Sequence, residues 1–139
     1  PPYVRLVGQV SNVADYIAAS DVGLLPTTFI GESMPLVLID FFAAGKPVVA
    51  TSAGDIPAMI DGEGGPAGRI VPLSNGRVSV SDIADALQAF FDPELRRACG
   101  RIGLRNFETR YTIEIMCDAY ENIYQAAYDQ RSASPTRPA

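Results

Sequence analysis

The hydrophobic residues of the chain are grouped in short runs that alternate between two spacings. Four runs are rich in β-branched and aliphatic residues and are predicted to be strands: 4–10, 22–26, 47–51 and 67–71. These runs are apolar throughout instead of alternating with polar residues. Such a pattern favours strands that are covered on both faces, as in a parallel sheet.

Two stretches between the strands have helical spacing. Residues 13–19 form a short helix with one apolar side, and residues 35–44 form a second. Pro35 suits the first helical turn, and Gly45 marks the end of the helix. Short connections between apolar strands favour parallel pairing with right-handed crossovers. The sequence therefore predicts an α/β fold.

The last third of the chain is predicted to be helical. Ser81 is expected to cap one helix. Residues 92–94, Asp-Pro-Glu, supply a cap, a first-turn proline and an acid, and they open a helix to about Phe107. Thr112 opens the final helix. Its apolar stripe is expected to pack in the core of its own domain: Ile113, Met116, Tyr120, Ile123, Tyr124 and Ala127.

Four strands make a small sheet. A doubly wound nucleotide-binding domain usually has about five or six strands, so we infer that this chain is a piece of something larger. Residues 1–128 are assigned to a partial domain. Residues 129–139 are rich in Ser, Pro and Arg and are predicted to be a disordered tail.

Composition excludes several classes of function. The 139-residue chain has a net charge of −5, so no basic face for nucleic acid is expected. It has no histidine and only two cysteines. A zinc site of the usual ligands is therefore not expected, and neither are catalytic pairs that need histidine. We predict no metal site and no cofactor.

Cysteine content and hydropathy indicate the compartment. Cys99 and Cys117 are expected to be buried free thiols, which suits a reducing cytoplasm. No apolar run approaches the roughly 18 residues of a membrane span, and residues 1–5 do not resemble a signal peptide. A cytoplasmic location is predicted, and the intact protein could attach peripherally to a membrane.

Two acids flank the start of the helix predicted at 35–44. Glu32 lies on the loop after the strand at 22–26, where ligands of open parallel sheets bind. The free N–H groups and dipole of a helix start at Pro35 would point to the same place. Asp40 follows inside the helix. This arrangement suits a nucleotide-sugar, which has a diol at each end and a diphosphate between. Each acid would bind a diol, and the helix start would attract the negative diphosphate.

Each acid also has a structural interpretation. Glu32 alone could be an ordinary solvated loop acid. Asp40 sits among apolar residues, where an acid must be paired or hydrogen-bonded, and it could cap a nearby loop through backbone N–H groups. The two acids at this spacing, on this order of elements, favour the functional interpretation.

The ordered set of motifs resembles a known enzyme family. Residues 31–51 look like the E-x7-E region of retaining GT-B glycosyltransferases of the group 1, or family 4, type. Four other segments of the family are matched in order. Residues 7–10 and 19–22 resemble its segments just before this region, residues 53–57 its GGxPE turn, and residues 68–72 the strand that follows. The resemblance extends over residues 4–128.

This resemblance implies a fold and a position within it. The family has two Rossmann-like domains with the active site between them, and the C-terminal domain holds most of the donor. This chain resembles the later part of that C-terminal, donor-binding domain. The N-terminal domain and the early strands, with their basic phosphate-binding residues, would lie outside this chain.

Roles are implied residue by residue. Glu32 would hold hydroxyls of the donor sugar, and the backbone N–H groups of Met34, Leu36 and Val37 would face the sugar and the diphosphate. Asp40 stands in place of the second Glu and would bind the ribose diol. Three other positions depart from the family pattern. Pro35 replaces a glycine and has no N–H, Asp55 replaces the second Gly of the turn, and Ala58 stands where the acid of that turn would be.

The implied reaction is sugar transfer from a nucleotide diphosphate donor to an acceptor hydroxyl, with retention at the anomeric carbon. The acceptor could be a glycan, a lipid or a small molecule. The isolated chain is expected to be inactive.

Two other functions are open. One is a non-catalytic nucleotide-sugar-binding or partner-binding module of the same fold. The other, an unrelated receiver-like signalling domain, is disfavoured because Asp15, Asp21 and Lys46 do not cluster at strand ends. Missing strands would also leave a bare sheet edge, which favours self-association, and the final helix could expose an apolar patch that the family covers with its N-terminal domain.

Overall fold

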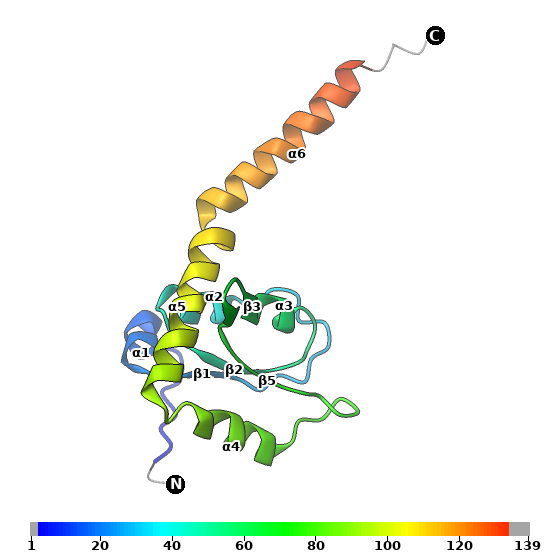
Figure 1. The fold of residues 1–139 in the computed structure, drawn as a ribbon. Coiled ribbons are helices and arrows are strands. Elements are labelled where there is room, and N and C mark those ends of the chain that lie inside the picture. The colour runs from blue at the N-terminus through cyan, green and yellow to red at the C-terminus, as the bar shows by residue number, and fades with distance from the viewer. Residues whose placement is uncertain (1–2, 134–139) are drawn as a thin grey trace.

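A computed structural model describes residues 3–133 of the chain. Its centre is a three-stranded parallel sheet in the order β1-β2-β5, formed by Gly23–Leu25, Val48–Thr51 and Gly68–Val71. Helices cover both faces of this sheet (Figure 1). The predicted α/β fold and three of the four predicted strands are therefore confirmed.

The fourth predicted strand, at residues 4–10, is wrong. This segment has no strand partner within the described part of the chain, and Leu6 is 93% exposed. Strand-forming residues need a neighbouring strand for their N–H and C=O groups. The outer edges of β1 and β5 are also unpaired among residues 3–133. Self-association through these edges stays a prediction.

The two faces of the sheet have separate hydrophobic cores. On one face, Val48 and Ala50 of β2 pack with helices α2 (Leu36–Ala43), α3 (Ile56–Ile60) and α5 (Pro93–Arg110). On the other face, Val49 and Val71 pack under α4 (Val80–Ala89), on the opposite side in Figure 1. All four residues of β2 are buried, which is why its first three positions are apolar, and the fourth is the buried threonine Thr51.

The first two helices lie close to their predicted positions. Helix α1 spans Val13–Ala19, as predicted. Helix α2 begins at Leu36, and Pro35 is its N-cap instead of a residue of its first turn. Pro35 has an extended ψ of 113°, so it stands just outside the helix. Gly45 follows with a φ of +64° and ends the helix as predicted.

A short segment that the sequence did not reveal joins β2 to β5. It contains α3 and a small antiparallel hairpin formed by β3 (Asp61–Gly62) and β4 (Gly65–Pro66). Asn106 of α5 is buried and donates hydrogen bonds to the carbonyl oxygens of Met59 and Asp61, at 3.2 Å each. One amide side chain thus fixes this segment against α5.

Caps define the starts of the later helices. The predicted cap Ser81 is wrong: the N-cap of α4 is Ser79, whose hydroxyl oxygen accepts from the Asp82 amide at 3.2 Å. Ser79 has an extended ψ of 127°, whereas Ser81 is already helical. Asp92 caps α5 as predicted, accepting from the Glu94 amide at 2.9 Å. Helix α5 continues three residues beyond Phe107.

Helix α6 (Ile113–Ala133) extends away from the rest of the molecule (Figure 1). Core packing of its stripe is therefore wrong. The helix also includes residues 129–133 of the predicted tail, while 134–139 lie outside the described residues. The large apolar side chains that α6 leaves exposed are Ile113, Met116, Tyr120, Ile123, Tyr124 and Tyr128.

The two cysteines have different environments. Cys99 is buried in the core beneath α4, and burial raises the pKa of its thiol, with Arg69 opposing the shift. Cys117 lies on α6 and is exposed, so its predicted burial is wrong. Neither cysteine forms a disulfide. Within the described part of the chain, no helix is long and apolar enough to cross a membrane.

Candidate functional site

The candidate site is the loop of residues 26–35, which connects β1 to α2. It leaves the sheet at the carboxyl end of β1, next to the carboxyl end of β2. The Thr51 hydroxyl donates a hydrogen bond to the carbonyl oxygen of Thr27 at 2.5 Å. Thr51 is fully buried, so this bond fixes the beginning of the loop to the central strand.

A second contact fixes the loop at Glu32. The amide of Asp55 donates to the carbonyl oxygen of Glu32 at 2.8 Å. This amide belongs to the turn between β2 and α3, so Glu32 is joined to the neighbouring crossover of the sheet. The sequence placed Glu32 on the loop but gave no indication of this bond, because the two residues lie far apart along the chain.

Gly54 makes the contact at Glu32 possible. Its φ is +49°, and a Cβ atom added to it would lie 1.8 Å from the Glu32 carbonyl oxygen. Only glycine allows both the conformation and the close approach. Asp55 has a φ of −87°, which any L-residue adopts. The replacement of the family's second Gly by Asp55 therefore leaves the backbone of this turn unstrained.

We expect Gly54→Ala to displace the Glu32 loop. Gly76→Ala is the matched control, because Gly76 also has a positive φ, of +70°, but open space where a Cβ would be. Both variants should lose about 1 kcal/mol or more of unfolding free energy from the backbone. Only Gly54→Ala should shift the amide resonances of Glu32 and Asp55 in ¹⁵N NMR spectra. Equal spectra for the two variants would contradict the role of Gly54.

The side chain of Glu32 is available to a ligand. Glu32 is partly buried, and its carboxylate forms no hydrogen bond or ion pair with any of residues 3–133. Beside it, the start of α2 offers backbone donors. Leu38 donates to the Pro35 carbonyl at 3.0 Å, whereas the amides of Leu36 and Val37 donate no backbone hydrogen bond within the described part. The loop thus presents a carboxylate next to unused N–H groups.

Exposed apolar side chains surround this loop. Met34, Leu36 and Val37, named from the sequence for their amides, all have exposed side chains. Phe29 and Ile30, which sequence reasoning did not single out, are 64% and 77% exposed. Large apolar residues in a loop were the signal that could have found them.

Asp40 has a different environment from the one expected. It is exposed and forms no hydrogen bond or ion pair with the described residues, so the expectation that it must be paired is wrong. The residue is on the solvent side of α2, where water satisfies its charge. It lies in a hollow of about 370 Å³ between α1 and α2, which is otherwise apolar and whose walls include Val13, Ile17 and Ala43.

The structure does not bring Glu32 into the same hollow. The hollow between α1 and α2 contains Asp40 but not Glu32. Glu32 lies before α2, and Asp40 is its fifth residue, so the start of the helix stands between the two acids. Within the described residues, no three Cys, Asp or Glu side chains cluster in a way that could hold a metal ion.

Comparison with known proteins gives the family. The model of the glycosyl transferases group 1 family matches residues 1–92 of this chain. The chain belongs to this glycosyltransferase family. The match includes the β1–α2 loop, α2 and the Gly54 turn, which are the segments that build the candidate site.

Curated relatives and a solved structure agree with this family. The chain is 32% identical over 122 residues to the N-acetyl-alpha-D-glucosaminyl L-malate synthase of Bacillus anthracis. It is 34% identical over 117 residues to the D-inositol 3-phosphate glycosyltransferase of Saccharomonospora viridis. The sucrose-phosphate synthase of Thermosynechococcus elongatus superposes with a TM-score of 0.75 at 25% identity, covering 89% of this chain.

The chain spans only part of the length of these proteins. It spans 30% of the N-acetyl-alpha-D-glucosaminyl L-malate synthase of Bacillus anthracis, 25% of the D-inositol 3-phosphate glycosyltransferase and 30% of the sucrose-phosphate synthase chain. The alignments to the two curated relatives cover 87% and 84% of this chain. The family relationship therefore concerns one segment of each relative.

Proposed function

We propose that this chain is the donor-binding part of a glycosyltransferase that moves a sugar from a nucleotide diphosphate donor to an acceptor hydroxyl, with retention of configuration. The chain would be the later part of the C-terminal domain of a longer enzyme. The short span relative to the curated relatives supports a longer enzyme. The position within that enzyme rests on the resemblance of residues 4–128 to the later part of the donor-binding domain. Retention rests on the resemblance of residues 31–51 to the E-x7-E region.

The Glu32 loop carries the proposal. Its backbone is fixed by the Asp55 amide. Within residues 3–133 its carboxylate has no partner, and it lies beside amides at the start of α2 that donate no backbone hydrogen bond there. Carboxylate oxygens accept hydrogen bonds from vicinal hydroxyls, and these charge-assisted bonds are about twice as strong as neutral ones. A fixed carboxylate at the carboxyl end of a parallel sheet suits the hydroxyls of a donor sugar.

The start of α2 would bind the diphosphate. The amides of Leu36 and Val37, together with that of Met34, would donate to the sugar and the phosphate oxygens, and the helix dipole would favour the negative charge. Pro35 contributes no donor because it has no N–H. In the reaction, these groups would stabilise the charge that develops on the leaving diphosphate.

Asp40 would bind the ribose diol from the other side of the helix start. A ribose held there would lie beside the hollow between α1 and α2, whose apolar walls suit one face of a base. This arrangement spreads the donor over the opening turn of α2. The intact enzyme would thus use two acids and a helix start to position one molecule.

The acceptor would be held outside this chain. Relatives of this chain are named for L-malate, D-inositol 3-phosphate and phosphatidyl-myo-inositol, which differ greatly in size. What these relatives share with this chain is the segment proposed to bind the donor. We place the reaction in the cytoplasm, since both cysteines are free thiols, with peripheral membrane contact through the intact protein.

Titration with nucleoside diphosphates tests the proposal. We expect UDP, GDP or ADP to shift the amide resonances of Met34, Leu36 and Val37 in ¹⁵N NMR spectra of the chain, in a saturable way. Calorimetry on the same samples measures the affinity. The absence of any saturable shift at these amides with all three nucleotides would overturn the proposal.

The non-catalytic alternative is tested with the intact protein. Asp40 is one methylene shorter than the family's Glu, so its carboxylate reaches less far toward a ribose. Donor binding without transfer of sugar to any acceptor, or to water, would favour a binding module of the same fold. Turnover would favour the enzyme.

A further inference from the structure

A second candidate site lies at the opposite end of the sheet from the Glu32 loop. The turn between α2 and β2 approaches the first half of α5 and leaves two adjoining hollows, of about 250 and 290 Å³, that share Gly45 and Arg97. We call them together the Gly45 cleft. Their walls contain four basic side chains: Lys46, Arg96, Arg97 and Arg101.

Two glycines bring these basic residues together. Gly45 has a φ of +64°, and a Cβ atom added to Gly100 of α5 would lie 2.2 Å from the Gly45 carbonyl oxygen. The backbone of α5 therefore touches the turn directly. This close approach places Lys46, which follows the turn, beside the basic residues on the first two turns of α5.

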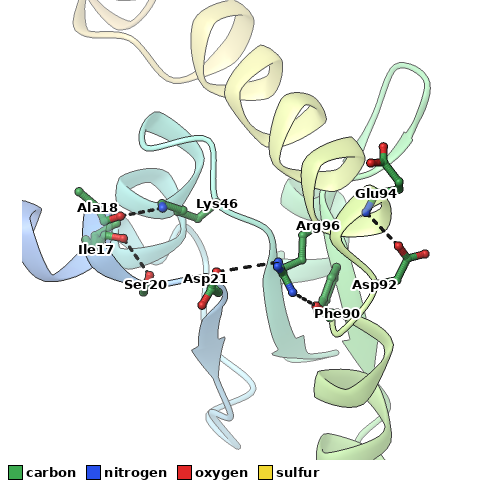
Figure 2. A network of polar contacts seen from close by, with 9 residues as sticks. All are labelled: Ile17, Ala18, Ser20, Asp21, Lys46, Phe90, Asp92, Glu94 and Arg96. Atoms are coloured by element: carbon green, nitrogen blue, oxygen red, sulfur yellow. Dashed lines mark hydrogen bonds and ion pairs between the residues drawn. The ribbon is translucent and has the colours of Figure 1, made fainter.

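The side chains in the cleft are held by neutral acceptors as well as by acids. Lys46 Nζ donates to the Ala18 carbonyl at 2.7 Å, and Arg96 Nη1 donates to the Phe90 carbonyl at 2.6 Å (Figure 2). These bonds orient the cations, and because a carbonyl oxygen is neutral, they do not cancel the positive charges. Lys46 keeps two further N–H donors, and Arg96 keeps donors on its second terminal nitrogen.

The cleft is positive in an acidic protein. Asp21 Oδ1 lies 3.9 Å from Arg96 Nε and is mostly exposed (Figure 2). Glu94 pairs with Arg97. Arg101 has no acidic partner among the described residues. Four cations thus face two carboxylates and leave a local charge of about +2, whereas the whole chain carries −5.

This charge is separate from the proposed donor site. Asp21 and Pro47, which line the cleft, precede β1 and β2, whereas the Glu32 loop follows the carboxyl end of β1. At least the length of β1, about 10 Å, separates the two places. A donor bound along the start of α2 would not reach the cleft.

We propose that the Gly45 cleft binds a phosphate ester group of a molecule other than the sugar donor. A phosphate ester carries a charge of about −1.5 to −2, which matches the uncompensated charge of the cleft. Arginine forks bind two phosphate oxygens at once, and the lysine adds a point charge. Lys46 and Arg96 are already oriented by their bonds to the Ala18 and Phe90 carbonyls, so these two side chains lose little conformational freedom on binding.

Titration of the full chain with inorganic phosphate and pyrophosphate tests this site. We expect saturable shifts of the Gly45 and Gly100 amides in ¹⁵N NMR spectra. Arg101→Gln and Lys46→Gln should each weaken the affinity about tenfold, and Lys46→Arg should keep it. Arg77→Gln is the matched control, because Arg77 is exposed and lies far from the cleft in the sequence and on another element.

Two further arms identify the source of the phosphate. Phosphatidylcholine vesicles with and without phosphatidylglycerol are sedimented with the wild-type chain and with Arg101→Gln. Binding only to the phosphatidylglycerol vesicles, lost in Arg101→Gln, assigns the group to a lipid headgroup. Shifts with free phosphate but no vesicle binding assign it to a dissolved phosphate ester.

The outcomes separate this site from the donor site. Phosphate shifts confined to the amides of Leu36 and Val37 would overturn the proposal for the Gly45 cleft and leave that for the donor site intact. A loss of affinity in Arg77→Gln as large as in Arg101→Gln would do the same. If nucleotides fail to shift the α2 amides while phosphate still shifts Gly45 and Gly100, the donor-site proposal is overturned and the proposal for the Gly45 cleft is supported.

Discussion

Replacing Glu32 by Gln should lower kcat/KM for sugar transfer by the intact protein about 10- to 100-fold, and Glu32→Ala should lower it further. A hydrogen bond from a ligand to a charged acceptor contributes about 1.5–3 kcal/mol. Glutamine keeps the size of the side chain and one oxygen but loses the charge. The fold should survive, because the Glu32 carboxylate forms no hydrogen bond or ion pair within residues 3–133 that would be broken.

Initial rates at several donor concentrations measure this effect. Glu108→Gln is the control, since Glu108 is an exposed acid on α5 and takes no part in the β1–α2 loop. It should match the wild type. Full transfer activity in Glu32→Ala would remove Glu32 from the donor site, and with it the main support for the proposed function.

Phe42→Ala should cost about 3–5 kcal/mol of unfolding free energy. Phe42 is fully buried in the core between α2, the sheet and α5, and its ring stacks on Tyr111 with centroids 6.4 Å apart. A Cβ atom added to Gly103 of α5 would lie 2.9 Å from the Phe42 ring, so the ring fills the space that this glycine leaves. Truncation would open a cavity between α2 and α5.

Urea unfolding of the chain measures this loss. Because domains of this size have only about 5–15 kcal/mol of stability, the variant should be close to unfolding at 37 °C. Phe91→Ala is the matched control: Phe91 is 80% exposed, and its truncation should change stability by no more than about 0.5 kcal/mol. Equal midpoints for the two variants would contradict the packing of Phe42 against α5.

Local signals in the sequence predicted the elements whose hydrogen bonds join residues close together along the chain. Helix α1 was placed without error, and Asp92 was recognised as a cap, because both depend on neighbouring residues. Strand 4–10 failed for the opposite reason: a strand forms only beside another strand. Ser79 and Ser81 are both good caps by composition, and only the extended backbone at Ser79 distinguishes them.

The candidate site shows the same division. Motif spacing placed Glu32 and the amides of α2 next to one another, since they are close along the chain. It also suggested that Asp40 needs a buried partner, because the sequence around it is apolar. In the structure that side of α2 faces solvent and α1, so Asp40 is exposed.

By itself, the sequence determined the α/β class, the parallel core strands and the loop on which Glu32 lies. These features depend on the spacing of apolar residues and on turn residues that are close together along the chain. Only the tertiary structure decided what holds that loop in place, and that four basic residues from two distant segments meet at Gly45. Both depend on close backbone approaches, of Gly54 to Glu32 and of Gly100 to Gly45. Such contacts join residues far apart in the chain. The only sign of them in the sequence is a glycine, which has no Cβ atom.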